Sequence, residues 1–182
     1  MKGKSQINSR RSIRLKDYDY SKPGAYFVTI CTKGHKNIFG NVVDSGIKLN
    51  ELGKIVSQYL YDLPNHYPHV KLDKFIIMPN HIHGIFMLVG AGFKPPPTIN
   101  KKRHGLTEII RAFKTFSSRK INKLYKISGT SVWQRNYYER IVRDEDELNK
   151  IRQYISDNPI KWELDKENPD SIMIEDKVPW ES

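Results

Sequence analysis

Runs of alternating hydrophobic and polar residues predict strands at several places along the chain. They are residues 24–32, 41–49, 70–78, 81–89 and 131–143. The first run is β-branched and aromatic, and 41–49 consists of two short pieces around a central Asp-Ser-Gly, as in a small hairpin. A Pro-Asn turn separates 70–78 from 81–89, so these two strands are expected to pair at the hydrophobic centre of the molecule.

Three other segments carry hydrophobic residues at intervals of three and four, which predicts amphipathic helices. They are residues 50–63, 106–125 and 145–158. Asn50 is a suitable cap for the first helix, and Pro64 is expected to end it. Asp144 and Glu147 form a capping box for the last helix, which should end at Asn158 because a proline follows.

The resulting order is strand, helix, strand, strand, helix, strand, helix. This order predicts an α+β fold, in which one antiparallel sheet of ferredoxin-like topology has helices packed against it. Residues 90–102 hold glycines and three consecutive prolines, which indicates a linker or loop. At 182 residues the chain is long enough for one domain with a real core.

Positive charge is unevenly distributed along the chain. The formal net charge is +11, and composition alone leaves an ordinary basic protein and a nucleic-acid-binding protein equally open. The N-terminal arm and the predicted helix 106–125 concentrate this charge, so both are expected to face phosphates. The candidate DNA-binding residues are Arg10, Arg11 and Arg14 in the arm and Arg111, Lys114, Arg119 and Lys120 in the helix.

The single cysteine, Cys31, excludes an intramolecular disulfide and a multi-cysteine zinc site. No secretion signal or apolar run of about 20 residues is evident, so we expect a soluble cytoplasmic protein without membrane partners. Binding of DNA by the basic segments would place the protein at the nucleoid.

His81 and His83 lie one residue apart in a predicted strand, so both imidazoles point from the same face. Their flanks are strongly apolar, and two rings in such surroundings need polar partners. A shared divalent metal would provide one, and ordinary hydrogen bonds on a half-exposed strand would provide another.

The stretch from Met78 to Gly84 (MPNHIHG) resembles the His-hydrophobic-His motif of HUH endonucleases, in the form found in REP-associated tyrosine transposases and related single-tyrosine insertion-sequence transposases. A second motif, residues 151–159 (IRQYISDNP), resembles the family's tyrosine helix. The resemblance implies that Tyr154 is the nucleophile and that His81, His83 and Asn158 hold Mg²⁺ or Mn²⁺. The i, i+4 spacing puts Tyr154 and Asn158 on one helix face. Many insertion-sequence relatives carry glutamine where this chain has Asn158.

The resemblance also implies the reaction and the organisation of the chain. The substrate would be single-stranded DNA with hairpin repeats, cut through a 5′-phosphotyrosine intermediate and rejoined without ATP. A basic arm (1–19) would precede a catalytic domain (20–164), and an acidic tail (165–182) would follow. The REP-associated branch favours a monomer, whereas mobile relatives form dimers that exchange the tyrosine helix.

Other readings remain open at this stage. Tyr137 and Tyr138 compete for the role of nucleophile, and together with Trp133 they are candidates for stacking on bases. A non-catalytic nucleic-acid-binding module or a nuclease that uses water would fit the same fold and charge. The remaining histidines fall in predicted loops or turns and are expected to be solvated: His35, His66, His69 and His104.

Overall fold

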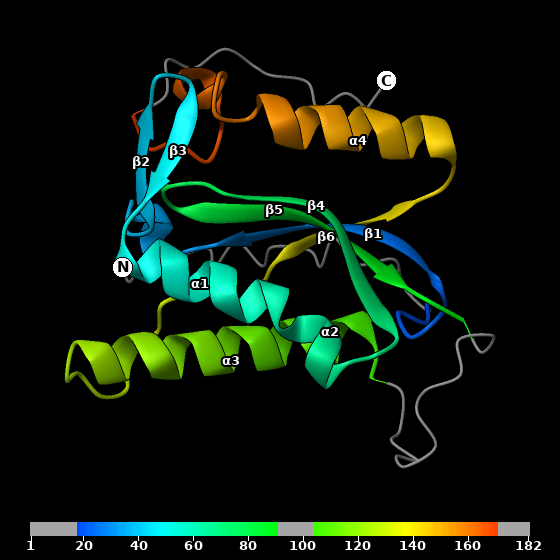
Figure 1. Cartoon of the computed structure of the whole chain (residues 1–182), viewed down its shortest axis with the longest axis horizontal. Helices are drawn as coiled ribbons and strands as arrows, with labels where there is room; N and C mark the ends of the chain where they lie inside the picture. Colours follow the sequence, from blue (N-terminus) through cyan, green and yellow to red (C-terminus); the bar gives the residue numbers. More distant parts are fainter. Residues whose placement is uncertain (1–17, 91–103, 171–182) are drawn as a thin grey trace, which may run out of the picture.

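A four-stranded antiparallel sheet forms the centre of the computed structural model, which describes residues 18–90 and 104–170. The strands are β1 (Gly24–Cys31), β4 (Val70–Ile77), β5 (His81–Leu88) and β6 (Tyr138–Val142). Their spatial order is β4-β5-β1-β6, and all neighbours are antiparallel (Figure 1). This order, with helices in both crossovers, confirms the predicted ferredoxin-like α+β fold. Residues 1–17 of the basic arm, residues 91–103 with most of the predicted loop, and residues 171–182 of the tail lie outside the described residues.

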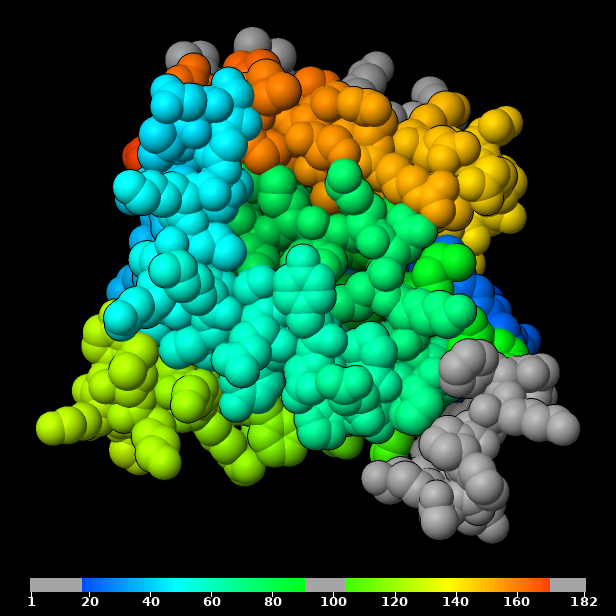
Figure 2. All heavy atoms as spheres, in the orientation of Figure 1, coloured from blue at the N-terminus to red at the C-terminus, as the bar shows by residue number. Residues whose placement is uncertain are grey.

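Helices cover both faces of the sheet. Helices α1 (Glu51–Tyr61) and α3 (Leu106–Leu124) pack on one face, and α4 (Glu145–Asp157) packs on the other (Figure 1). The smaller core under α4 consists of Ala25, Phe27, Ile85, Leu148, Ile151 and Ile155. In the space-filling view, α4 and α3 form opposite margins of the molecule, with α1 and the sheet edge between them (Figure 2).

Local sequence signals explain several element boundaries. The Asn50 side chain accepts a hydrogen bond from the Gly53 amide, and the Asp144 side chain accepts one from the Glu147 amide. The predicted hairpin consists of β2 (Gly40–Val43) and β3 (Gly46–Leu49). Asp44 and Ser45 at its tip both adopt positive φ, as the turn requires.

Pro64 does not end the first helix, which already ends at Tyr61. Instead it lies in the first turn of a short helix, α2 (Leu63–His66). Proline suits this position because the first amides of a helix have no helical partner. The prediction that Pro64 terminates α1 was therefore wrong.

The last strand is shorter than the predicted 131–143, because residues 131–137 leave the regular ladder apart from a bridge between Trp133 and Thr32. The Trp133 ring turns into the core against Phe39 and Phe113, and its Nε1 donates to Ser117 Oγ. With the indole buried in the core, residues 131–137 do not continue the regular strand.

Two short 3₁₀ turns complete the described elements: η1 (Lys33–His35) and η2 (Trp162–Leu164). No helix within the described ranges is both long and apolar enough to span a bilayer.

Candidate active site

The two histidines of the HIH motif begin strand β5 and point toward α4. Side chains alternate between the two faces of a strand, and Ile82 and Gly84 face the larger core. His81 and His83 therefore both face the other side of the sheet, which α4 covers. Both side chains are almost fully buried, at 0% and 1% exposure, and their ring centroids lie 4.4 Å apart.

Asn80 determines which nitrogen of His81 carries the proton. Its Nδ2 donates to the backbone carbonyls of His35 and Glu167, so its Oδ1 is the atom that faces His81 Nδ1 at 2.8 Å. An amide oxygen only accepts, so Nδ1 must be the donor and Nε2 carries the lone pair. That Nε2 is buried and has no hydrogen-bond partner among the described residues. Burial lowers the pKa of His81, against the opposing charges of Asp165 and Glu167, which favours the neutral ring.

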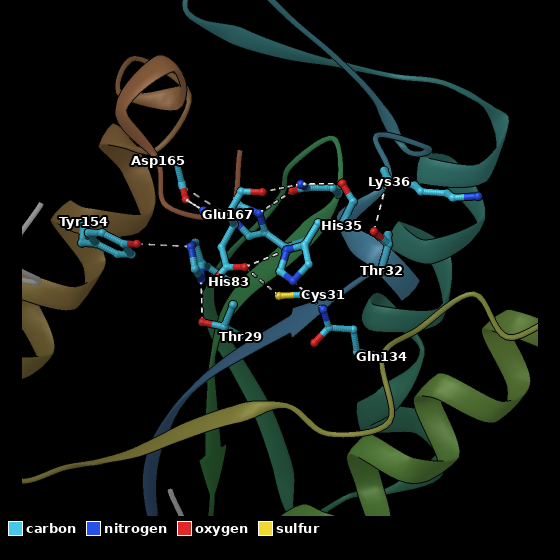
Figure 3. A network of polar contacts seen from close by, with 12 residues as sticks. Thr29, Cys31, Thr32, His35, Lys36, His83, Gln134, Tyr154, Asp165 and Glu167 are labelled. Atoms are coloured by element: carbon cyan, nitrogen blue, oxygen red, sulfur yellow. Dashed lines mark hydrogen bonds and ion pairs between the residues drawn. The ribbon is translucent and has the colours of Figure 1, made fainter. Parts of the chain in front are cut away.

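Tyr154 reaches the histidines from α4. Its hydroxyl lies 3.3 Å from His83 Nε2, while His83 Nδ1 lies 2.9 Å from Thr29 Oγ1 (Figure 3). Phe27 supports the tyrosine ring edge-on, with a centroid separation of 6.0 Å. Burial lowers the pKa of His83 well below its ordinary value, and the neighbouring His81 lowers it further, so this ring too is neutral.

Asn158 and Asp165 complete the buried cluster. Asn158 follows α4, is 3% exposed, and donates from Nδ2 to Asp165 Oδ2 at 2.8 Å. Its Oδ1 has no hydrogen-bond partner within residues 18–90 and 104–170. Asp165 Oδ2 lies 3.9 Å from His81 Nε2. Asp165 falls at the start of the predicted acidic tail, and an acid in an acidic segment carries no local signal of a role in the site.

This donor set can hold a divalent metal. Ligand atoms of His81, His83 and Asp165 all lie within 4.8 Å of one another. Buried polar atoms normally have partners, yet His81 Nε2 and Asn158 Oδ1 have none. Two imidazole nitrogens with amide and carboxylate oxygens form a mixed ligand set that suits several divalent first-row ions.

The predicted DNA-binding residues of α3 are not close to this cluster, because α3 covers the opposite face of the sheet (Figure 1). Arg111, Arg119 and Lys120 are exposed. Lys114 is half-buried, and its Nζ donates to the backbone carbonyls of residues 134, 135 and 136. Burial lowers the pKa of Lys114 to about 8. Arg10, Arg11 and Arg14 lie outside the described residues.

The aromatic residues near β6 have different surroundings from Tyr154. Trp133 is 3% exposed and belongs to the core. Tyr137 packs at the edge of the larger core, and its hydroxyl donates to Thr107 at 3.4 Å. Tyr138 packs edge-on against Phe27. Among the three tyrosines considered as nucleophiles, Tyr154 is the one hydrogen-bonded to a histidine of the motif.

Comparisons with known proteins agree with the fold and indicate the family. Residues 24–158 match the sequence profile of the family "Transposase IS200 like". An uncharacterised protein of Haemophilus influenzae is 40% identical over 173 residues, covering 88% of this chain and 93% of that protein. A solved structure of a REP-associated tyrosine transposase bound to a REP hairpin superposes with a TM-score of 0.55 at 16% identity, covering 82% of this chain and 74% of that one.

The ferredoxin-like sheet with helices on both faces is thus the fold of a transposase. The chain belongs to the IS200-like transposase family.

Proposed function

We propose that this transposase cuts and rejoins single-stranded DNA at hairpin repeats, with Tyr154 as the nucleophile. One observation carries the proposal: the Tyr154 hydroxyl lies 3.3 Å from His83, beside two buried lone pairs that have no hydrogen-bond partner. The structural neighbour bound to a REP hairpin supports the choice of substrate. Arg111, Arg119, Lys120 and the basic arm would hold the DNA backbone.

His81, His83 and Asn158 would hold the metal ion, and Asp165 is positioned to add a carboxylate. Mg²⁺ or Mn²⁺ bound there would polarise a non-bridging phosphate oxygen and favour in-line attack. Asn80 holds the Nε2 lone pair of His81 in the orientation that a ligand needs. The His83 Nε2 lone pair can serve one partner at a time, so its contact with the Tyr154 hydroxyl and its use as a ligand alternate.

Attack by Tyr154 forms a bond between its phenolic oxygen and phosphorus, and breaks the bond from phosphorus to the 3′ oxygen. The phenol loses its proton, and the departing 3′ oxygen gains one. The products are a 5′-phosphotyrosine and a free 3′-hydroxyl, and a second 3′-hydroxyl can reverse the step on another strand. A tyrosine with an ordinary pKa near 10 needs its proton removed for the attack. While His83 Nε2 holds the metal it has no free lone pair, so the phenol proton would pass to solvent.

The test is the covalent adduct. Labelled hairpin oligonucleotides would be incubated with the full chain and Mn²⁺ or a chelator, and denaturing gels would detect a protein–DNA band. We expect a metal-dependent band that Tyr154→Phe abolishes and His81→Ala reduces by at least about 10²-fold. Tyr138→Phe is the matched control and should keep the band.

Two outcomes would contradict the proposal. Metal-dependent cleavage without an adduct would indicate hydrolysis by water. Tight hairpin binding without cleavage, unchanged by Tyr154→Phe, would indicate a non-catalytic nucleic-acid-binding module.

A further inference from the structure

We propose that Cys31, His35 and Glu167 form a second metal site that takes a thiophilic divalent cation such as Zn²⁺. Cys31 ends β1, His35 belongs to η1, and Glu167 follows η2 near the end of the described chain. None of the three is a proposed ligand of the first site. Metal binding at this second site does not require the tyrosine chemistry of the first.

The three side chains converge on one point (Figure 3). Glu167 Oε2 lies 3.3 Å from Cys31 Sγ and 3.0 Å from His35 Nδ1, and the ligand atoms all lie within 4.8 Å of one another. Typical zinc bond lengths in a tetrahedron imply edges of about 3.5 Å between sulfur and carboxylate oxygen and about 3.3 Å between nitrogen and oxygen. The observed separations are shorter by only a few tenths of an ångström. Small side-chain movements would therefore admit the ion.

The chemistry of the donors separates this site from the first. A thiolate, an imidazole and a carboxylate form a ligand set that zinc binds well, whereas the first site offers no sulfur. Binding would replace the thiol proton of Cys31, which is released to solvent, with a metal–sulfur bond. Cys31 is buried, whereas His35 and Glu167 are partly exposed, so an ion can enter from their side and keep water in the fourth position.

Gln134 provides a partner for Nε2 of His35, the ring nitrogen that does not face Glu167. Its side-chain amide lies against His35 Nε2, and Figure 3 shows it beside the imidazole. With metal on Nδ1, the ring proton moves to Nε2, and a rotated Gln134 amide would accept it through Oε1. A metal-bound histidine normally has such an acceptor on its second nitrogen.

Asn80 links the second site to the first. Its amide donates to the backbone carbonyls of His35 and Glu167 and accepts from His81. Asp165, which contacts Asn158 in the first site, lies two residues before Glu167 and accepts from the Glu167 amide. An ion on Glu167 would thus hold the segment that supplies Asp165.

Cobalt spectroscopy of the full chain tests this proposal. Co²⁺ bound to a thiolate absorbs in the near ultraviolet through sulfur-to-metal charge transfer, and the chain contains a single cysteine, so the band reports Cys31 alone. We expect the band to reach the intensity of one thiolate-bound Co²⁺ per chain and to disappear on addition of Zn²⁺. Cys31→Ser should abolish it, and His35→Ala or Glu167→Gln should weaken binding by about tenfold or more.

The double variant His81→Ala/His83→Ala is the matched control and should retain the band, because it removes ligands of the first site only. Circular dichroism would establish that each variant is folded. Cobalt binding without a charge-transfer band would overturn the proposal, as would one ion shared by the cysteines of two chains. If the charge-transfer band appears but the protein forms no DNA adduct, the second metal site would be supported and the proposed tyrosine chemistry would be contradicted.

Discussion

At the scale of single residues, the buried side-chain amide of Asn80 makes three hydrogen bonds that join the two sites. Replacing it with alanine leaves His81 Nδ1 and two backbone carbonyls without their partner. Of these three hydrogen bonds, the one to His81 Nδ1 is fully buried and those to the carbonyls are partly exposed. An unsatisfied buried group costs about 1–3 kcal/mol, so Asn80→Ala should lower the free energy of unfolding by about that amount. Affinity for Mn²⁺ should fall about 10- to 100-fold, because His81 loses the acceptor that orients it.

Urea unfolding and Mn²⁺ titration would measure the two effects of Asn80→Ala. Asn65 is exposed and bonded to its neighbour Asp62, so Asn65→Ala is the matched control and should change stability by less than about 0.5 kcal/mol. An Asn80→Ala protein as stable as the control would show that these hydrogen bonds contribute little.

The limits of sequence reasoning are clearest at this scale. The His81/His83 spacing and the Tyr154/Asn158 spacing are local, and a strand or helix period converts each into a shared direction. Asp165 and Cys31 lie far apart in sequence from the histidines, and tertiary packing alone brings them near. His35 was expected to be solvated, yet it pairs with Glu167, which a sequence pattern cannot indicate.

At the scale of elements, one ion pair joins the tyrosine helix α4 to the edge strand β4. Arg152 donates from Nε and Nη2 to the two carboxylate oxygens of Asp73, at 2.8 and 2.6 Å. Asp73 lies at the register irregularity of β4. Both side chains are partly exposed, so Asp73→Asn should lower the free energy of unfolding by only about 0.5–1 kcal/mol at pH 7.

The same pair predicts a pH dependence. Hydrogen bonds from Arg152 lower the pKa of Asp73 in the folded protein. The ion pair therefore contributes its full stabilisation above the pKa of about 3.9 that Asp73 has in the unfolded chain. This stabilisation is lost as the pH falls through the lower pKa of Asp73 in the folded protein. The stability difference between the wild type and Asp73→Asn should shrink in that acid range. Glu145→Gln removes a more exposed partner of Arg152 and should have a smaller effect.

Two lysines of α3 should separate folding from DNA binding. Lys114 donates to three carbonyls of the segment before β6, so Lys114→Met should cost about 2 kcal/mol of stability. Lys120 is exposed, so Lys120→Met should leave stability unchanged. If Lys120 contacts a phosphate, its removal should weaken hairpin binding and lower the salt slope by about one. Unchanged binding and salt slope in Lys120→Met would remove it from the interface.

Element-level prediction succeeded where hydrophobic period and capping agreed. Strands β4 and β5 and helices α1, α3 and α4 lie where the pattern indicated, because their buried faces and caps are local properties. The segment 131–137 alternates as a strand would, but burial of the Trp133 ring outweighs strand pairing there. Alternation alone cannot distinguish a residue that faces a sheet core from one that packs into a helix layer.

At the scale of the whole molecule, the position of α4 predicts whether an active site consists of residues from one chain or from two. In this structure, Tyr154 on α4 reaches His83 of the same chain. We therefore expect a monomer, with a mass near 21.3 kDa by light scattering, whose site is complete by itself. A dimer with exchanged tyrosine helices would instead pair Tyr154 of one chain with the histidines of the other.

Mixing two inactive variants distinguishes these arrangements. In a helix-exchanged dimer, the chain with His81→Ala would supply its tyrosine to the intact histidines of the chain with Tyr154→Phe, and the mixture would recover part of the adduct. Sites made within one chain allow no such rescue, because every chain in the mixture lacks either the nucleophile or a proposed ligand. We expect the mixture, unfolded and refolded together, to form no more adduct than the two variants form separately. Recovery would show that the helix is exchanged in solution, even though Tyr154 and His83 meet within one chain here.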